Sequence, residues 1–487
     1  MPPADPTDSA PRRPNVVLVF GDEWRAQATG YAGDPNVRTP RLDRLAGESL
    51  NLTEAVAGCP VCCPYRASLM TGQYPLTHGV VINDVPIRPD APSIPRALGP
   101  HGYESAWIGK WHLYGSPEGR NERRRDPVPR AHQLGFDRFM AGECSHDYGN
   151  SHYSVNDDPT LRIWEGYDAF AQTDTACDWL KRPERKDRPF FLGLSWGPPH
   201  MPLQTAPPEY RQRFWPEDMR LRPNVPEAFA EAAPRDLAGL SAHIAALDDA
   251  LGRVLDTLEA ADLAEDTILI FTSDHGSQHH SQGLNFKLFP FDESVRVPFL
   301  LRWPRRFGRE ARELPVPIDA PDILPTLAGL CGLPPPPQAE GRDWSPVLRG
   351  EAEVREDDAA LLMVAARFTA LRWHDFPEYR GLRTARHTYV ASWDGPFLLF
   401  DNREDPFQMR NLVEVPDARP ARDHLDALLR QRLEALGDPF DTSDIVLRQR
   451  GLGHYREANQ PVRRPWTDPW LPGAANALRG AWTLDTP

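Results

Sequence analysis

The sequence predicts an α/β fold with a large, mainly parallel sheet flanked by helices, followed by a smaller C-terminal α+β domain that carries an antiparallel sheet. Two continuous apolar runs are typical of strands buried on both faces, NVVLVF at 15–20 and TILIFT at 267–272. Before the second strand, one amphipathic helix is predicted by apolar residues that repeat at steps of four and three: Leu240, Ile244, Leu247, Leu251, Val254 and Leu258. Strands that alternate with helices favour a parallel sheet.

The remaining elements follow from shorter patterns. Two further strands are predicted from ESAWI at 104–108 and FFLGLSW at 190–196. After about residue 350 the pattern changes, because 380–402 indicates short strands with turns and 418–436 indicates a helix. The sequence therefore predicts three parts: a disordered leader at 1–14, a large domain at 15–355, and a C-terminal α+β subdomain at 356–487 with a Pro/Trp-rich tail that wraps over the surface.

The overall charge limits the classes of partner. The 487 residues carry a formal net charge of −14, which argues against bulk binding of nucleic acid or of an anionic membrane. There is no run of about 18 apolar residues, so we expect no membrane span. The apolar run near the N-terminus is short and lacks a small-residue cleavage site, so we expect no signal peptide and a cytoplasmic location. A small anionic substrate is still compatible with this charge, because a pocket can be locally positive.

Three of the six cysteines lie together in GCPVCCPYRASLMTG. So few cysteines in so long a chain do not form a disulfide framework, and a zinc site would lack its second half. Cys62 differs from its neighbours, because Pro64 suits the first turn of a helix and Arg66 follows one turn on. This places Cys62 at the positive end of that helix, where an anionic group is stabilised. Cys59 and Cys63 are expected to be buried as small apolar residues.

The pattern Cys62-x-Pro64-x-Arg66 also resembles the signature of the type I sulfatases of the alkaline phosphatase superfamily. The similarity continues along most of the chain in family order, through CCPYRASLMTGQYPLTHG, GYESAWIGKWH, SDHG, NFKLFPFDESVRVPFLLRWP, DILPTL and DNREDPFQMRNL. A short motif can arise by chance, but an ordered set of this length does not. The resemblance implies an alkaline phosphatase-like sheet and a catalytic domain at 15–355.

The resemblance also implies an unusual nucleophile. In this family, a separate formylglycine-generating enzyme oxidises the signature cysteine to Cα-formylglycine. Only Cys62 matches that frame, since Cys59 and Cys63 lack Pro and Arg at the right offsets. One hydroxyl of the hydrated aldehyde attacks sulfur and releases the alcohol. The second hydroxyl then loses its proton, which expels sulfate and restores the aldehyde; a serine could perform only the first half.

Polar residues follow two of the predicted strands, Asp22 and Glu23 after the first, Asp274 and His275 after the second. Ligands of such sheets bind beyond the carboxyl ends of the strands, so the two pairs suggest one composite site. By resemblance, these residues and the Cys62 position hold one divalent metal. Glu23 stands where the family usually has Asp, Asn or Gln. Oxygen-rich ligands predict Ca²⁺, with Mn²⁺ or Mg²⁺ as alternatives because of the histidine.

Five further residues receive catalytic roles from the resemblance. Lys110 and His112 alternate in the extended segment GKWH, so both can enter one pocket. Lys110 is expected to hold the formylglycine hydroxyl, and His112 to act as the base for sulfate release. His200 would contact the sulfate and protonate the leaving oxygen, and Lys287 would hold sulfate oxygens. Arg66 would orient the formylglycine diol.

The sequence thus predicts a sulfuric ester hydrolase that cleaves a carbohydrate or aryl sulfate monoester. The alternative is a phosphonate monoester or phosphodiester hydrolase of the same superfamily, because a phosphodiester carries the same single charge as a sulfate monoester. A silent, binding-only member is disfavoured because the candidate set is intact. The expected partners are a small anionic sulfate ester and, during maturation, the formylglycine-generating enzyme; self-association into a homo-oligomer is left open.

One polar loop, ECSHDYGNSHYS, has a weaker claim. It is compatible with the substrate entrance and equally with a solvated surface loop: His146, Asp147, Asn150 and His152.

Overall fold

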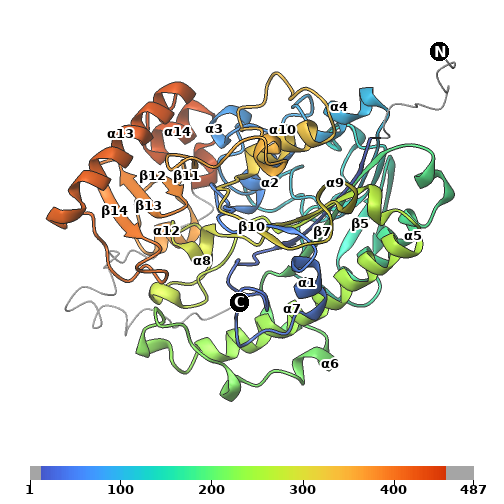
Figure 1. The fold of residues 1–487 in the computed structure, drawn as a ribbon, viewed down its shortest axis with the longest axis horizontal. Coiled ribbons are helices and arrows are strands. Elements are labelled where there is room, and N and C mark those ends of the chain that lie inside the picture. Colours follow the sequence, from blue (N-terminus) through green and yellow to red (C-terminus); the bar gives the residue numbers. More distant parts are fainter. Residues whose placement is uncertain (1–12, 457–487) are drawn as a thin grey trace, which may run out of the picture.

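A ten-stranded sheet runs through the middle of the computed structural model, which describes residues 13–456 (Figure 1). The strand order is β10-β2-β9-β8-β1-β7-β3-β4-β5-β6. The strands have the following bounds: β1 Asn15–Asp22, β2 Leu50–Leu52, β3 Glu104–Lys110, β4 Arg138–Gly142, β5 His152–Val155, β6 Asp158–Ile163, β7 Phe190–Pro199, β8 Thr267–Ser273, β9 Leu300–Arg302 and β10 Arg312–Leu314.

The centre of this sheet is parallel. Strand β1 lies between β8 and β7, and β3 and β4 continue in the same direction. Antiparallel pairs occur toward the two edges, between β8, β9 and β2 and between β4, β5 and β6. Every residue of β1 and β8 is buried, as expected for strands covered on both faces. The predicted mainly parallel sheet is confirmed; β3 and β7 extend beyond the predicted segments, to Lys110 and Pro199.

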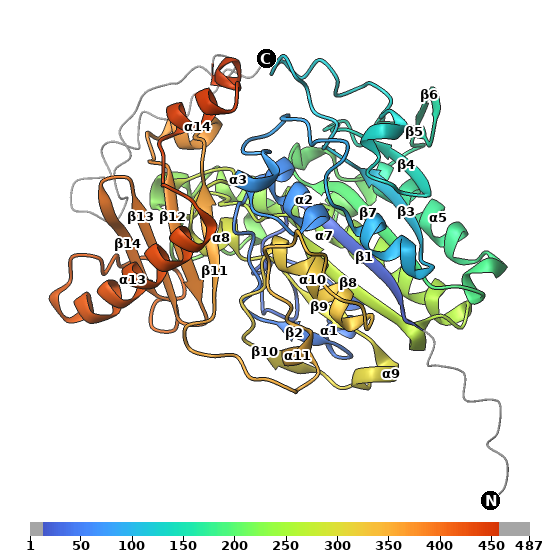
Figure 2. The ribbon, with the colours of Figure 1, turned by 90° about the horizontal axis from the view of Figure 1, so that it is seen from above.

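Helices cover both faces of the large sheet (Figure 2). On one face, α1, α5 and α7 pack against Val17 and Val19 of β1. On the other face, α2, α4 and α10 share a core with Val16 and Leu18. The six residues of the predicted apolar stripe are all buried in α7. The helices have the following bounds: α1 Pro40–Ala46, α2 Cys62–Thr71, α3 Pro75–His78, α4 Ile94–Leu98, α5 Asp168–Leu180, α6 Pro208–Arg211, α7 Ala233–Ala260, α8 Asp292–Val295, α9 Pro304–Phe307, α10 Ala320–Leu330, α11 Ser345–Leu348, α12 Thr369–Trp373, α13 Arg419–Leu436 and α14 Ser443–Gln449.

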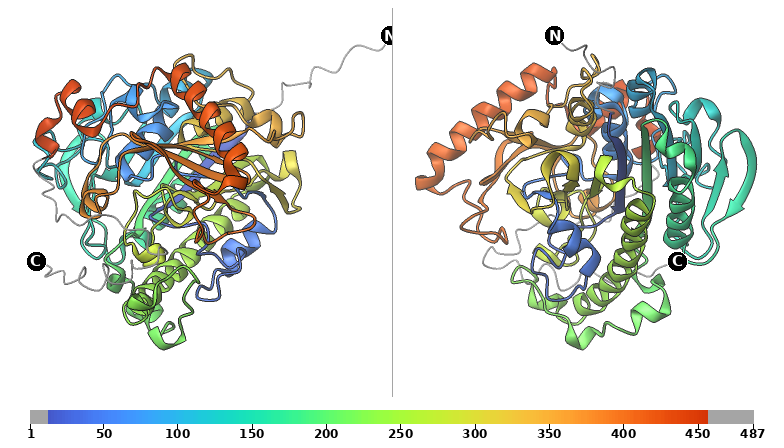
Figure 3. Two further views of the ribbon diagram at one scale, coloured as in Figure 1. Left: turned by 90° about the vertical axis from the view of Figure 1, so that its left-hand side faces the viewer. Right: turned by 45° about the vertical axis from the view of Figure 1, so that its right-hand side comes forward.

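The C-terminal part forms a second, antiparallel sheet of four strands within the described residues, in the order β11-β12-β13-β14. Helix α13 lies along this sheet (Figure 3). The antiparallel sheet and the helix are confirmed, and β11 is a strand that the sequence patterns missed. The strand bounds are β11 Ala359–Val364, β12 Tyr379–Thr384, β13 His387–Ser392 and β14 Gly395–Asp401.

The apolar core of the small sheet is continuous with one face of the large sheet, since Leu361 and Tyr389 belong to the same buried cluster as Val16 and Leu18. The boundary at 355/356 stays a prediction. Nearly all of the predicted leader, residues 1–12, and the tail after residue 456 lie outside the described residues. Among the helices of residues 13–456, none combines the length and the apolarity that crossing a membrane requires.

Candidate active site

The carboxyl ends of two central strands bring the first candidate residues together. Strands β1 and β8 are parallel neighbours, and Gly21 pairs with Ser273. Asp22 and the pair Asp274-His275 therefore leave the sheet side by side. All three side chains are fully buried. The sequence positions predicted as one composite site thus meet at one edge of the sheet.

The turn after β1 is held by hydrogen bonds from its backbone. Glu23 has a φ of 67°, a left-handed conformation that is unfavourable for a residue with a side chain. Its N–H donates to Asp274 Oδ1 at 3.1 Å, and the N–H of Trp24 donates to Ser273 Oγ at 2.9 Å. These two bonds to the neighbouring strand end stabilise the strained turn and keep Asp22 aimed at Asp274.

Four of the predicted metal ligands form one group, with ligand atoms within 4.8 Å of one another: Asp22, Cys62, Asp274 and His275. Burial and the nearby charge of Asp22 raise the pKa of Asp274. Arg66 and Lys110 compensate part of the negative charge of the two buried carboxylates, and a divalent cation would compensate the rest. Two carboxylates, an imidazole and the residue 62 side chain are a suitable donor set for such a cation.

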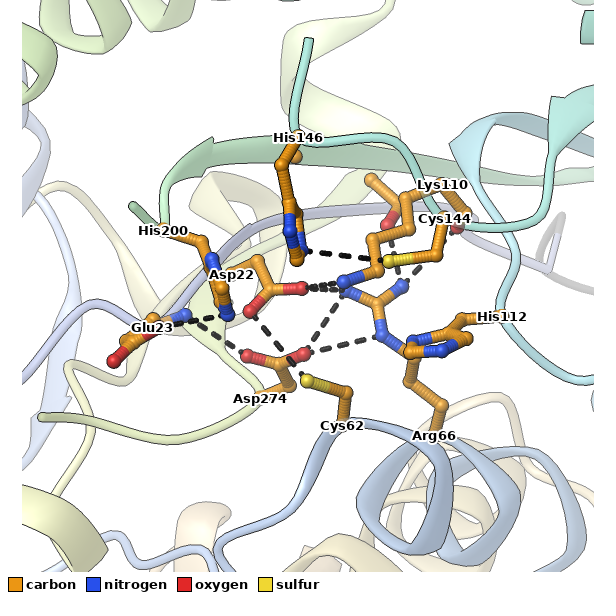
Figure 4. A network of polar contacts seen from close by, with 12 residues as sticks. Asp22, Glu23, Cys62, Arg66, Lys110, His112, Cys144, His146, His200 and Asp274 are labelled. Carbon is orange, nitrogen blue, oxygen red and sulfur yellow. Dashed lines mark hydrogen bonds and ion pairs between the residues drawn. The ribbon is translucent and has the colours of Figure 1, made fainter. Parts of the chain in front are cut away.

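Glu23 is directed elsewhere (Figure 4). Its Oε2 atom lies 2.9 Å from His200 Nε2 and 3.4 Å from Lys287 Nζ. With Asp22 and His200, Glu23 forms a second group of closely spaced ligand atoms. The structure therefore divides the predicted ligand set into two groups that share Asp22.

Cys62 is the first residue of α2, as the position of Pro64 predicts. Its Sγ atom lies 3.2 Å from His275 Nε2, 3.4 Å from Lys287 Nζ and 3.8 Å from Asp22 Oδ1. Burial and Asp22 raise the pKa of the thiol, but Lys287, Lys110 and His275 outweigh them, so the pKa falls well below its ordinary value. The environment of position 62 stabilises a negative charge there.

Arg66 pairs with the carboxylates of Asp22 and Asp274. Its Nε donates to Asp274 Oδ2 at 3.1 Å, and its Nη2 lies 3.4 Å from Asp22 Oδ2. Nη1 donates to the Lys110 carbonyl at 3.1 Å and to Ser195 Oγ at 2.8 Å. The guanidinium, 1 % exposed, thus joins the ends of β1, β3, β7 and β8.

The two lysines contact different partners in the site. The Nζ atom of Lys110 pairs with Asp22. Lys287 Nζ contacts Cys62 and Glu23 and lies 2.7 Å from His200 Nε2. Burial lowers the pKa of each ammonium, but the neighbouring anionic groups more than compensate, and both pKa values are raised. Both lysines therefore stay charged beside position 62.

His112 lies on the Cys63 side of the site. Its Nε2 atom is 3.4 Å from Asp84 Oδ1, and Arg124 donates to both oxygens of Asp84 at 3.2 and 2.9 Å. Burial lowers the pKa of His112, but Cys144 and Cys63, together with Asp84, raise it well above its usual value. The ring is thus oriented by a buried carboxylate that sequence reasoning did not identify.

His146 and Cys144 also lie at the site (Figure 4). The rings of His146 and His200 stack with centroids 4.4 Å apart. Cys144 Sγ lies 3.6 Å from His146 Nε2. Burial raises the pKa of Cys144, but His112, Lys110 and His146 lower it well below its ordinary value. The polar loop contained a signal for His146, whereas nothing in the sequence distinguished Cys144.

A cavity of about 270 Å³ opens beside Lys110. Three of the four residues singled out in the polar loop line it, His146, Asp147 and His152, and Asn150 is not among the lining residues. The cavity gives a substrate direct access to one of the candidate catalytic lysines.

The sequence model of the sulfatase family matches residues 14–333, more than half of the chain. The chain belongs to the sulfatase family. A second model, the C-terminal region of N-sulphoglucosamine sulphohydrolase, matches residues 281–436. This sulfatase is therefore a sulfuric ester hydrolase of the alkaline phosphatase superfamily, a family that generally uses a metal ion and formylglycine.

Named relatives cover most of the chain. An ulvan-active sulfatase of Formosa agariphila is 39% identical over 441 residues, which cover 90% of this chain and 84% of the relative. An endo-4-O-sulfatase of Bacteroides thetaiotaomicron is 30% identical and covers 89% of this chain and 94% of its own.

Solved structures agree with the fold. A Bacteroides thetaiotaomicron structure described with the metabolism of multiple glycosaminoglycans is 28% identical, with a TM-score of 0.79, and covers 90% of this sulfatase and 99% of that chain. The phosphonate monoester hydrolase of Agrobacterium radiobacter, 24% identical over 87% of this chain and 96% of its own, has a TM-score of 0.68 and shares the fold.

Proposed function

We propose that this sulfatase hydrolyses a sulfate monoester of a carbohydrate, with Cα-formylglycine at position 62 as the nucleophile and Ca²⁺ as its divalent cation. The carbohydrate is supported by the two relatives at 30% identity or more, an ulvan-active sulfatase and an endo-4-O-sulfatase. A formylglycine-generating enzyme would convert the Cys62 thiol to the aldehyde during maturation.

The position of Cys62 carries the proposal. Its Sγ atom is 3.2 Å from His275 Nε2 on the side of the carboxylate pair and 3.4 Å from the Lys287 ammonium on the other side. A nucleophilic oxygen on the same carbon would lie close to His275 and to the Lys287 ammonium, which can bind sulfate oxygens. Such convergence suits attack on an anionic ester.

The cation would be held by Asp22, Asp274 and His275, with Glu23 adjoining through Asp22. Oxygen-rich donors favour Ca²⁺ over softer ions, and Mn²⁺ and Mg²⁺ are the alternatives. Bound there, the cation supplies positive charge that compensates the two carboxylates and lowers the pKa of an attached hydroxyl.

The side chains of the protein supply the remaining steps. Lys110 would hold the formylglycine hydroxyl, and Lys287 would neutralise the sulfate oxygens as charge develops; each well-placed donor of this kind contributes about 3 kcal/mol at the transition state. His200 would donate the proton to the leaving alcohol oxygen. Burial and Lys287, 2.7 Å from Nε2, lower the pKa of the ring, but Glu23, 2.9 Å from Nε2, and Asp22 outweigh them and raise it. His112 in its neutral form would remove the proton from the second hydroxyl and thereby expel sulfate, and Asp84, 3.4 Å from its Nε2, would stabilise the imidazolium that forms.

A substrate panel tests the proposal. The purified, matured enzyme should cleave 4-nitrophenyl sulfate and sulfated monosaccharides much faster than phenylphosphonate or bis(4-nitrophenyl) phosphate. The alternative has support of its own, because the multifunctional alkaline phosphatase superfamily protein PehA of Trinickia caryophylli is 27% identical over 92% of this chain and 98% of its own. A clear preference for the diester or the phosphonate would overturn the proposed sulfate specificity.

The nucleophile has its own test. Cys62→Ala should abolish turnover, by about 10⁴-fold or more, because no other group on the same carbon can form the covalent ester. Cys177→Ala is the matched control, since Cys177 is equally buried but contacts the Arg253 carbonyl. The control should keep full activity, and both variants should unfold near the wild-type temperature. Peptide mass spectrometry of the wild type should find an aldehyde at position 62; substantial activity of Cys62→Ala would contradict its role.

A further inference from the structure

We propose that the cavity beside Lys110 binds the sugar ring of the substrate, and that Asp168 and Gln172 select it by accepting hydrogen bonds from ring hydroxyl groups. This inference rests on the proposed function and extends it, since it names the residues that recognise the alcohol part of the ester.

Both acceptors come from one face of α5. Asp168 is its first residue and Gln172 follows four positions later, so the two side chains lie on the same side of the helix. Both residues line the cavity and are 3 % exposed. Asp168 Oδ1 and Gln172 Oε1 are buried without a hydrogen-bond partner among the described residues. Two unpaired buried acceptors at one cavity are costly, unless a ligand or water donates to them.

The second Asp168 oxygen is fixed. Ser151 Oγ donates to Asp168 Oδ2 at 2.7 Å, which holds the carboxylate and leaves Oδ1 as the acceptor for a ligand. Burial raises the pKa of Asp168 to about 7. Above that pH, Asp168 and Gln172 can together accept hydrogen bonds from two hydroxyl groups.

The acceptors lie beside the strands that carry catalytic candidates. A Cβ atom added at Gly109, the residue before Lys110, would meet Gln172 Oε1 at 3.0 Å. A Cβ added at Gly197, three residues before His200, would come within 3.9 Å of Asp168 Oδ2. The absence of side chains at these two glycines leaves the acceptors close to the strand ends. A ring bound to them would therefore lie next to Lys110, which lines the same cavity.

One apolar wall and the size of the cavity fit one sugar ring, while polar and charged side chains such as Arg124 and Asp147 make up much of the remaining lining. Trp164 lines the cavity, and its ring stacks on Tyr153 with centroids 3.8 Å apart, which fixes a flat apolar surface. The volume of about 270 Å³ is slightly below that of typical small-molecule sites, which begin at about 300 Å³, so the cavity holds at most one ring. A hydroxyl-bearing ring satisfies both acceptors and the apolar wall, whereas a plain aryl or alkyl alcohol satisfies only the wall.

The test compares two substrates on each variant. The probes are 4-nitrophenyl sulfate, which has no ring hydroxyl, and the best cleaved of glucose 3-sulfate, galactose 4-sulfate and N-acetylglucosamine 6-sulfate. Gln172→Met removes the acceptor at nearly constant volume. We expect kcat/KM for the sugar sulfate to fall about tenfold, the loss of one hydrogen bond, while kcat/KM for 4-nitrophenyl sulfate changes less than twofold. Asp168→Asn should also lower kcat/KM for the sugar sulfate more than kcat/KM for 4-nitrophenyl sulfate.

The matched control is Gln73→Met. Gln73 also has a buried, unpartnered Oε1, but it lies at a different surface cavity with Pro334 and Pro335. This variant should leave both substrates unchanged. With the wild type, a deoxy sugar sulfate that lacks the recognised hydroxyl should show the same loss of kcat/KM as Gln172→Met shows with the parent sugar. With Gln172→Met, the deoxy sugar should show no further loss of kcat/KM.

Each other outcome overturns the inference. If Gln172→Met lowers kcat/KM equally for both substrates, Gln172 has a structural role. If the variant cleaves the sugar sulfate as fast as the wild type, Gln172 is not part of the binding site. Cleavage of 4-nitrophenyl sulfate without cleavage of any sugar sulfate would reject the sugar-ring site but keep sulfate ester hydrolysis. A wild type that cleaves neither class of sulfate would reject the proposed function, and the inference with it.

Discussion

At the scale of single residues, Arg66 decides whether the carboxylates of the site can be buried together. It contacts Asp22 and Asp274, neither of which is exposed to solvent. The expected role of Arg66 in orienting the formylglycine diol stays a prediction. Removal of one partner from a buried ion pair leaves the other charge uncompensated, and this is more destabilising than the pair is stabilising.

Arg66→Met should therefore lower the unfolding free energy by about 3–5 kcal/mol in the presence of a chelator. Saturating Ca²⁺ should restore part of that loss, because the cation replaces the missing positive charge. Denaturant unfolding with EDTA and with Ca²⁺ measures both values. Arg44→Met is the control: Arg44 forms an exposed pair with Glu48 at 3.4 Å, which contributes less than about 1 kcal/mol. An equal loss for Arg66→Met with and without Ca²⁺ would contradict this explanation.

At the scale of elements, strand β3 delivers Lys110 through a residue that must be glycine. Gly109 has a φ of 103°, and a Cβ there would meet the Ser195 carbonyl of β7 at 2.1 Å. The neighbouring backbone of a central strand cannot move away without breaking the parallel pairing. The positive φ and the close approach to β7 together explain why the residue before Lys110 is a glycine.

Gly109→Ala should cost at least about 2 kcal/mol of unfolding free energy and should reduce kcat, because the strand end that carries Lys110 is displaced. Gly102→Ala separates the two causes. Gly102 has a φ of 90° but open space around it, so its substitution should cost only about 1 kcal/mol and leave kcat unchanged. Thermal unfolding and steady-state kinetics provide the readouts. Similar behaviour of the two variants would show that the clash with β7 is unimportant.

The N-terminus of α10 makes stability depend on pH. Asp319 accepts the N–H groups of Gly58 at 2.7 Å and Ala320 at 2.6 Å, while burial and Asp322 raise its pKa to about 8. In the unfolded chain its pKa returns to about 3.8. Between these values the folded chain holds a proton that the unfolded chain releases, so this residue lowers the unfolding free energy as pH rises from about 4 to 8.

Asp319→Asn keeps the acceptor oxygen but removes the titration. The unfolding free energy of the variant should fall less than that of the wild type between pH 5 and pH 8. Urea unfolding of both proteins at four pH values across this range gives the comparison. Parallel pH profiles for the two proteins would show that Asp319 ionises without a shift.

At the scale of the whole molecule, the C-terminal sheet holds the segment that carries Lys287. Tyr379 of β12 donates its hydroxyl to the Leu288 carbonyl at 2.8 Å. Arg383 of the same strand donates to both oxygens of Asp292 at 3.0 Å. The small sheet thus contributes to the site although it supplies none of the predicted catalytic residues.

Tyr379→Phe should lower kcat several-fold because Lys287 becomes less well positioned, and should cost about 1 kcal/mol of stability. Tyr389→Phe is the matched control, since its hydroxyl donates to Asp426 of α13 at 2.7 Å on the same sheet. The control should show a similar loss of stability and a normal kcat. If both variants keep a normal kcat, the small sheet does not position Lys287.

Sequence reasoning reached the central strands and the motif residues because both have strong local signals. The runs at β1 and β8 are apolar throughout, and Cys62 is distinguished by Pro64 and Arg66. Short strands such as Leu50–Leu52 have too few residues for a pattern. The contacts of Glu23 with His200 and of Asp84 with His112 depend on side-chain directions after folding, which no spacing in the sequence encodes.

The position of β1 in the middle of the sheet has a consequence for synthesis of the chain. Glu23 and Asp274 are separated by 251 residues, so at 5–20 residues per second a ribosome needs about 13 to 50 s to deliver the second after the first. During this interval β1 lacks its neighbour β8, so the N-terminus of α2 cannot yet pack against the completed end of the sheet. Cys62, 1 % exposed once the molecule has closed, is open to a modifying enzyme in that period. Slower translation would lengthen this period, and faster closure of the sheet would shorten it.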